Sequence, residues 1–119
     1  MRCLLPCGAD LFEADLTNTN LSGANLTAAD LTGTSLIKAR LIGASLTRAN
    51  LTIAHLFGTH LAGAHLMEAN LAGTNLEGAT LVNTDLTGAD LTGCRIYGVS
   101  VGSEAGEDEA TELGHHSVR

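Results

Sequence analysis

Large apolar residues recur at every fifth position along most of the chain, without a gap or a slip. These residues are all Leu up to position 91, and the last two are Ile96 and Val101. The Leu members of this column are Leu11, Leu16, Leu21, Leu26, Leu31, Leu36, Leu41, Leu46, Leu51, Leu56, Leu61, Leu66, Leu71, Leu76, Leu81, Leu86 and Leu91. Two residues before each Leu lies a small residue, Ala or Thr, as in Ala9, Thr19 and Ala89. The repeating unit is therefore small-polar-Leu-x-x.

A period of five fits neither the 3.6-residue period of an α-helix nor a sustained alternation of two. In an extended segment the small residue and the Leu share one face, and the polar residue between them points the other way. The last two positions then turn the chain, and the second of them is often Gly, as a type II turn with positive φ requires. Ile53 occupies this second position, and because a β-branched residue resists positive φ, the sequence predicts a different turn there.

If each turn is close to a right angle, about four units of five residues make one coil, and successive coils pair as parallel strands. Residues 9–101 then form an all-β, four-sided parallel β-helix of about four to five coils. Its interior is filled by Leu with the small residues beside it, and burying each Leu contributes roughly 1.5–3 kcal/mol. No coil buries its Leu alone, so stacking supplies the stability.

The units Ala24-Asn25-Leu26-Thr27-Ala28 and Ala89-Asp90-Leu91-Thr92-Gly93 resemble the A(D/N)LXX signature of the pentapeptide-repeat family. About four-fifths of the chain carries this pattern. The resemblance implies a right-handed quadrilateral β-helix, a pentapeptide-repeat solenoid. The family includes quinolone-resistance proteins that resemble B-form DNA and bind DNA gyrase, while most of its members have no assigned role.

The two ends depart from the repeat. Residues 1–8, which include Leu4, Leu5 and Pro6, are expected to cap the first coil, and the acidic segment 102–119 is expected to be disordered. No long apolar run precedes the repeats, so a soluble, cytoplasmic protein without membrane insertion is expected. The last coil lacks an evident cap, which predicts a homodimer through a C-terminal end formed by Leu91, Ile96 and Val101.

The formal net charge of −7 argues against direct nucleic-acid binding, which needs a basic patch. Residues twenty apart should stack, which makes Asp10, Asp30 and Asp90 a candidate acidic column with Asn50 and Asn70 between them. Two interpretations of this column stay open: a structural ladder of hydrogen-bonded side chains, and an acidic recognition stripe.

The same alignment groups apolar residues at the first turn position. Ile37, Phe57 and Tyr97 fall in one column, and Ile42 and Val82 fall in the next together with Ala62. Scattered exposed apolar residues are normal in soluble proteins, but two neighbouring columns of them favour a partner surface. These residues are the preferred candidates for binding a protein partner.

No catalytic residues or cofactor can be nominated. His55, His60 and His65 are five residues apart and should therefore point from three different sides, which does not suit a shared metal ion. Cys3, Cys7 and Cys94 form no CxxC pair and are interpreted as reduced thiols. Two function classes remain: a non-enzymatic protein-interaction scaffold with an unknown partner, and a DNA-mimicking modulator of a type II topoisomerase, which would need more acidic surface along the rod.

Overall fold

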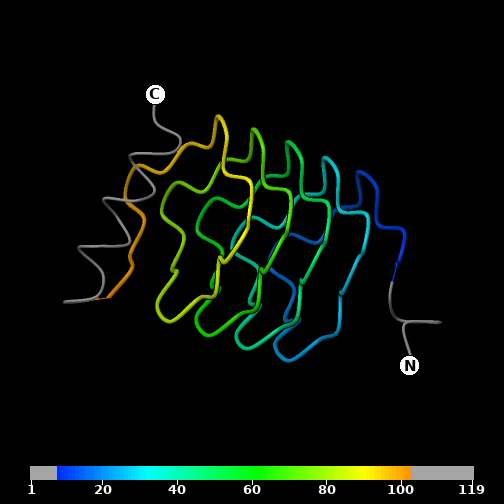
Figure 1. Ribbon diagram of the computed structural model, residues 1–119, viewed down its shortest axis with the longest axis horizontal. Coiled ribbons are helices and arrows are strands. Elements are labelled where there is room, and N and C mark those ends of the chain that lie inside the picture. Colours follow the sequence, from blue (N-terminus) through cyan, green and yellow to red (C-terminus); the bar gives the residue numbers. More distant parts are fainter. Residues whose placement is uncertain (1–7, 103–119) are drawn as a thin grey trace.

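The chain coils into a solenoid in which four pentapeptides complete one turn. The computed structural model describes residues 8–102. Within this range the polar residue of each pentapeptide pairs in parallel with the polar residue twenty positions later, as Asp10 does with Asp30 and His60 with Thr80. Figure 1 shows the coils stacked one beside the next along the long axis. The pairing distance in sequence confirms the predicted coil of about twenty residues.

These pairings form four ladders, one on each side of the solenoid. Each pentapeptide contributes a single paired residue, so the strand segments are one residue long and the described range contains no helix. We name the four sides faces A to D after their ladders: Asp10, Asp30, Asn50, Asn70 and Asp90 on face A; Asp15, Ser35, His55, Asn75 and Arg95 on face B; Asn20, Arg40, His60, Thr80 and Ser100 on face C; Asn25, Ser45, His65 and Asp85 on face D. Coils are numbered from the N-terminus, with the second at 29–48, the third at 49–68 and the fourth at 69–88.

Every corner between two faces is the same tight turn. The N–H of the small residue donates to the carbonyl oxygen of the Leu three residues earlier, for example Ala14 to Leu11 at 2.9 Å. The residue at the second turn position has positive φ at each corner, whether it is Gly, as at Gly43 with φ 68°, or not, as at Arg48 with φ 60°. Positive φ at this position alone defines a type II turn, as the sequence predicts for the glycines.

The prediction for Ile53 is wrong, because this residue has φ 52° and forms the same type II turn as the others. The reason lies in the neighbouring coils. The Ile53 N–H donates to the Ala72 carbonyl of the next coil at 2.9 Å, and the Thr52 carbonyl accepts the Gly33 N–H of the preceding coil at 3.0 Å. Pairing on both sides fixes the geometry of the corner and overrides the local preference of a β-branched residue, at a cost of order 1–3 kcal/mol.

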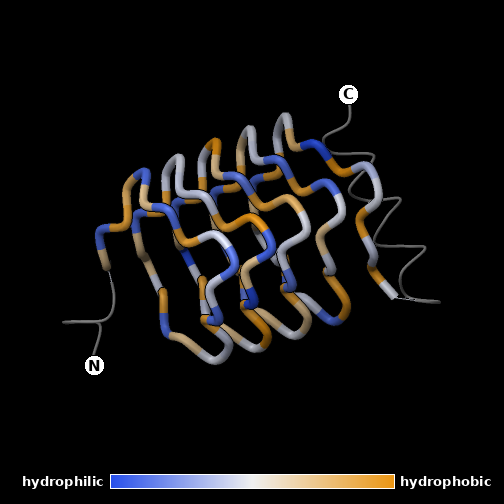
Figure 2. Tube along the Cα trace, turned by 180° about the vertical axis from the view of Figure 1, so that it is seen from behind, coloured by the Kyte–Doolittle hydropathy of each residue, from blue (hydrophilic) through white to orange (hydrophobic). Residues whose placement is uncertain are grey.

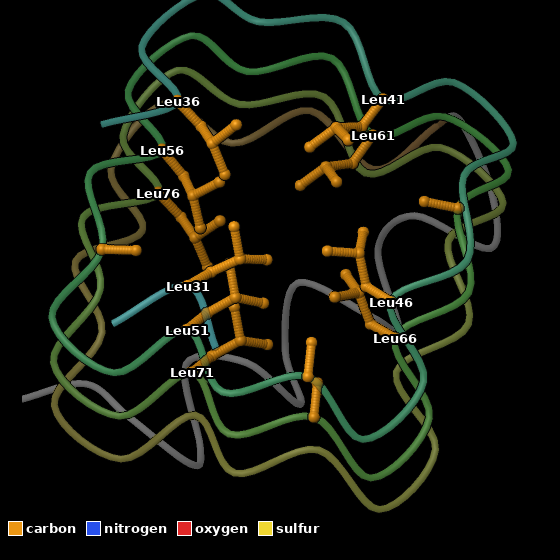
Figure 3. Packing of buried hydrophobic residues seen from close by; sticks show 14 of the residues in the cluster. Leu31, Leu36, Leu41, Leu46, Leu51, Leu56, Leu61, Leu66, Leu71 and Leu76 are labelled. Atoms are coloured by element: carbon orange, nitrogen blue, oxygen red, sulfur yellow. The ribbon is translucent and has the colours of Figure 1, made fainter. Parts of the chain in front are cut away.

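The interior is a close stack of Leu side chains from all four sides. From Leu31 to Leu81 every Leu of the column is at most 1% exposed. Figure 3 shows Leu36, Leu56 and Leu76 stacked from one side and Leu41 and Leu61 facing them from another. The small residues fill the space beside the Leu side chains. Where the small residue is a buried Thr, its hydroxyl donates a hydrogen bond to a backbone carbonyl, as Thr59 does to Leu36 at 2.7 Å. Burial and hydrogen bonding therefore operate together in this core.

The expected N-terminal cap and acidic tail lie almost wholly outside the described residues, which include only Gly8 and Gly102 of those segments. Leu11, Leu16 and Leu21 in the first coil are partly buried, as are Leu86, Ile96 and Val101 near the other end. In the part of the chain that the structure describes, no helix has the length and apolar character needed to cross a membrane.

Candidate functional site

The first column of candidate partner residues lies at the corner between faces B and C. Backbone hydrogen bonds between coils set its register: the Lys38 N–H donates to the Phe57 carbonyl at 2.9 Å, and the Gly58 N–H donates to the Glu77 carbonyl at 2.9 Å. Ile37, Phe57, Glu77 and Tyr97 therefore follow one another up this corner. The register predicted by aligning residues twenty apart is confirmed for these side chains, with Glu77 as a charged interruption.

The second column lies at the corner between faces C and D. Here the Gly43 N–H donates to the Ala62 carbonyl and the Gly63 N–H to the Val82 carbonyl, both at 2.9 Å. Ile42, Ala62 and Val82 follow one another up this corner. The two apolar columns are thus the two edges of a single side, face C, rather than part of two separate sides.

The two corners expose their apolar side chains to different extents. Tyr97 is 85% exposed, Phe57 43% and Ile42 42%, whereas Ile37 and Val82 are partly buried. Figure 2 shows apolar residues at outward corners of the coils as well as along their sides. Exposed aromatic and aliphatic side chains that gather at the edges of one face are typical of a contact surface for another protein.

Face C differs from the opposite face in charge. Its ladder contains Arg40 and His60 and no carboxylate, whereas the ladder of face A contains the three carboxylates of the candidate acidic column, Asp10, Asp30 and Asp90. Faces A and C are opposite sides of the solenoid because two corners separate them in either direction. The candidate partner surface therefore lies on the side turned away from the acidic column.

The carboxylates of face A act locally, in their own turns. The Oδ1 atom of Asp30 accepts a hydrogen bond from the Thr32 N–H at 3.1 Å and another from the Thr32 hydroxyl at 2.7 Å. Asn50 makes the same pair of bonds to Thr52. The sequence interpretation placed such bonds between side chains up the ladder, but these side-chain oxygens cap the following turn instead. The regular order of the column thus has a structural explanation that does not involve a partner.

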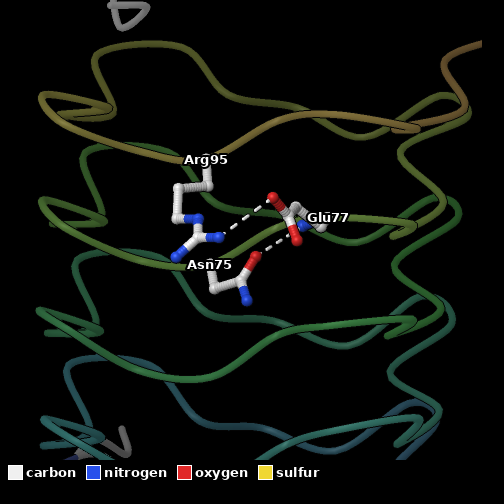
Figure 4. A network of polar contacts seen from close by, with 3 residues as sticks. All are labelled: Asn75, Glu77 and Arg95. Atoms are coloured by element: carbon white, nitrogen blue, oxygen red, sulfur yellow. Dashed lines mark hydrogen bonds and ion pairs between the residues drawn. The ribbon is translucent and has the colours of Figure 1, made fainter.

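One ion pair marks the edge of face C. Arg95 Nη2 lies 3.4 Å from Glu77 Oε2, and the Glu77 N–H donates to Asn75 Oδ1 at 3.0 Å. Figure 4 shows the Arg95 side chain reaching from its own coil toward Glu77 beside Asn75. The Arg95 side chain is 67% exposed, so solvent screens this pair and its contribution to stability is about 0–1 kcal/mol.

The remaining candidate chemistry is dispersed. His55, His60 and His65 lie in three different ladders, and within residues 8–102 no group of three His, Cys, Asp or Glu side chains is arranged to hold a metal ion. Cys94 is buried beside Thr74, and burial raises the pKa of its thiol although the hydrogen bond between the two side chains acts in the opposite direction. Cys3 and Cys7 lie outside the described residues. In the candidate dimer end, Leu91 is buried while Ile96 and Val101 are partly buried.

Two further exposed apolar side chains were not among the sequence candidates. Phe12 is 54% exposed and Ile53 is 55% exposed, and both lie at the corner between faces A and B. They are two coils apart, with Thr32 between them in the column of Phe12, so they form no continuous patch. Aligning residues twenty apart would have placed both side chains at this corner, which is away from face C.

Comparisons with known proteins agree with this geometry. A family profile described as pentapeptide repeats matches residues 9–48, 49–88 and 64–100. HetL, a pentapeptide repeat protein involved in heterocyst differentiation regulation in the cyanobacterium Nostoc, is 36% identical with a TM-score of 0.76 over 79% of this chain, which spans 45% of HetL. A second Nostoc pentapeptide repeat protein is 29% identical with a TM-score of 0.55, over 82% of this chain and 85% of that one.

A pentapeptide repeat protein of the Arabidopsis thaliana thylakoid lumen is 26% identical with a TM-score of 0.54, covering 98% of this chain and 81% of that protein. No curated protein matches the chain in sequence. The solved relatives are right-handed quadrilateral β-helices, so the predicted fold class, including its handedness, is confirmed.

Proposed function

The chain belongs to the pentapeptide-repeat family, and we propose that it is a non-enzymatic scaffold that binds a protein partner through face C and its two apolar corners. We call this the face C surface: the ladder Asn20, Arg40, His60, Thr80 and Ser100, with Ile37, Phe57, Glu77 and Tyr97 on one edge and Ile42, Ala62 and Val82 on the other.

The observation that carries the proposal is the gathering of exposed apolar side chains around one side that has no carboxylate in its ladder. An aromatic side chain such as Phe57 or Tyr97 offers a large contact area at a small cost in conformational entropy. The coils beneath hold these side chains in fixed register, so a partner meets a preformed surface.

Site-specific photo-crosslinking tests this proposal. A photoreactive phenylalanine analogue is placed at position 57 and, in a matched variant, at position 52, which is the first turn position of the same coil at the corner between faces A and B. The full chain is irradiated in extract of its source organism. We expect protein adducts from position 57 that disappear when Ile42→Asp is added, and far fewer adducts from position 52. Equal yields from both positions would contradict the proposal.

The alternative, a DNA-mimicking modulator of a type II topoisomerase, has weaker support. Residues 8–102 carry eight carboxylates against four Lys or Arg side chains, and the ladder of face C contains no carboxylate, so the acidic surface does not surround the rod. The carboxylates are those of Asp10, Glu13, Asp15, Asp30, Glu68, Glu77, Asp85 and Asp90, and the basic side chains are those of Lys38, Arg40, Arg48 and Arg95. A DNA mimic needs a continuous acidic potential. We expect no inhibition and no quinolone protection in a gyrase supercoiling assay, and either effect at low micromolar protein would favour the alternative.

A further inference from the structure

The apolar edges of the face C surface are self-complementary, and Lys38, at the corner between faces B and C, is opposite in charge to Glu77 at the same corner. We infer that the partner it accepts is a second copy of this chain, packed face C against face C with the two solenoid axes antiparallel. This inference rests on the proposed function, since it names the partner of that surface. It differs from a dimer through the C-terminal end, because the last coil is not its centre.

The symmetry of such a dimer follows from the register of the coils. The two-fold axis crosses face C at the third coil, perpendicular to the solenoid axis. It keeps the corner between faces B and C opposite its own counterpart and exchanges the second coil with the fourth. Lys38, at this corner in the second coil, then lies opposite the partner's Glu77 in the fourth coil. The same contact occurs twice, so the exposed Lys38 and the partly buried Glu77 each face a group of opposite sign.

The apolar residues match under the same operation. Ile42, in the second coil, lies opposite the partner's Val82 in the fourth coil, again twice. At the third coil Phe57 and Ala62 lie opposite their own counterparts across the axis. The small Ala62 leaves room at one edge, while the Phe57 rings meet at the other.

Other ways of packing two copies lose this match. A two-fold axis parallel to the solenoid would place the corner between faces B and C against the corner between faces C and D, and thus Glu77 against the partner's Val82. That contact buries a carboxylate on an apolar side chain. Packing through face A would set Asp10 against the partner's Asp90 under the same operation, and Asp30 against its own counterpart about a two-fold axis parallel to the solenoid.

The two charged groups are available for this contact. Lys38 is exposed, and its side chain lies over Gly58 in the third coil, with Cγ 3.3 Å from where a Cβ of Gly58 would stand. Glu77 is partly buried, with 28% of its side chain exposed, and among the described residues its ion pair is with Arg95, whose exposure makes the pair weak and screened. Five coils spaced about 4.8 Å apart give a face about 20 Å tall. With a cross-section of 24 Å the face covers at most about 480 Å² in projection, which is small beside the ~800 Å² per partner of a standard interface. A reversible dimer is therefore expected.

Charge exchange tests the arrangement directly. Self-association of the full chain is measured by sedimentation equilibrium for the wild type, for Lys38→Glu, for Glu77→Lys and for an equimolar mixture of these two variants. Each variant alone places like charges opposite each other in both symmetric contacts, and we expect the dissociation constant to rise at least tenfold. In the mixture, a heterodimer has opposite charges at both contacts, so association should return to about the wild-type strength.

The matched control is Arg48→Glu, which reverses a charge at the same turn position of the same coil but at the corner between faces D and A. It should leave the dissociation constant unchanged, and thermal melting should show that all variants fold. A wild type that is monomeric at high micromolar concentration, or a mixture no stronger than its components, would overturn the inference. So would loss of association in Ile96→Lys with no effect of the charge variants, which would identify the C-terminal end instead. Crosslinks from position 57 to a different protein would then leave the proposed function intact.

Discussion

The interior of the solenoid repeats every five residues, whereas the exterior repeats, where it repeats at all, only every twenty. Inside, Leu31, Leu36, Leu41 and Leu46 come from four different sides and meet around one axis, so all of them are under the same constraint. Outside, a side chain such as Phe57 points away from that axis, and the residues next to it in its column come from the coil before and the coil after. The interior therefore specifies the fold, and the exterior is free to differ from face to face.

This difference has a functional consequence. Because the core is independent of the outward residues, charge and apolar character can be distributed unequally around it. Face A carries carboxylates and face C carries apolar edges, although the same turns and the same pairing build both. The distinction between faces, rather than the repeat itself, is what a partner can recognise.

The largest difference between interior and exterior is expected when a new carboxylate is introduced into each region. Leu51→Asp should unfold the protein, because an unpaired carboxylate in the Leu stack costs several kcal/mol and the total stability of a domain is about 5–15 kcal/mol. Asn50→Asp, one residue earlier but outward on a ladder that already contains Asp, should change stability by less than ~0.5 kcal/mol. Circular dichroism melting measures both. An unchanged melting profile for Leu51→Asp would contradict the assigned interior.

Ile53 tests how far the interior constrains an outward residue. Its φ of 52° strains the backbone, and its side chain is 55% exposed. Ile53→Gly relieves the strain while Ile53→Ala does not, so the Gly variant should be the more stable of the two by about 1 kcal/mol. The control is a Gly-to-Ala substitution at a corner where an added Cβ meets no other atom. Gly43 has φ 68° with no atom within 4 Å of an added Cβ, so Gly43→Ala should lose about as much stability in urea unfolding.

The interior was predictable from the sequence residue by residue, because the Leu column has no interruption from Leu11 to Leu91. The coil of twenty residues and the stacking of Ile37, Phe57 and Tyr97 followed from it. The turn at Ile53 was not predictable from local preference, since hydrogen bonds to the next coil decide its conformation. Handedness came from the family resemblance and not from the period, which is the same for either hand.

The candidate site was predicted in part. Its apolar residues were identified, but treating each column separately hid the fact that two columns border one face. Glu77 was counted as a charge of the rod and not as a member of the column that contains Phe57. The sequence placed Thr34, Thr59 and Thr84 in the interior beside the Leu column, but it did not indicate that their hydroxyls donate to Leu carbonyls.

These buried hydroxyls give a smaller contrast within the interior itself. Thr59 donates to the Leu36 carbonyl at 2.7 Å, and that carbonyl also accepts the Ala39 N–H at 2.9 Å. Thr59→Val keeps the volume, and Val99 shows that Val occupies this column in the last coil. Since the carbonyl retains one partner, the variant should lose only about 1 kcal/mol. A loss above ~3 kcal/mol in urea unfolding would mean that the hydroxyl holds the coils together.

The smallest effect is expected on the outside, at the turn that follows Asp85. Hydrogen bonds from the Thr87 hydroxyl and the Thr87 N–H, both to Oδ1, lower the pKa of the Asp85 carboxyl, and His65 adds a weaker electrostatic effect in the same direction. Thr87→Val removes the hydroxyl and keeps the N–H, so the pKa of Asp85 should rise part of the way toward its ordinary value. The pKa of Asp15, which Thr17 lowers in the same manner on another face, should not change.

The sign of the stability effect follows from the direction of that shift. A carboxyl whose pKa is lower in the folded chain contributes stability above its unfolded pKa and loses it as the pH falls through the folded value. Thr87→Val should therefore be slightly less stable than the wild type at neutral pH, and the difference should disappear in strong acid. A carboxyl-detected NMR titration measures both pKa values in one sample. If Asp85 titrates identically in the two proteins, the Thr87 hydroxyl does not bond to it in solution, and the exterior turns are less ordered than the interior that supports them.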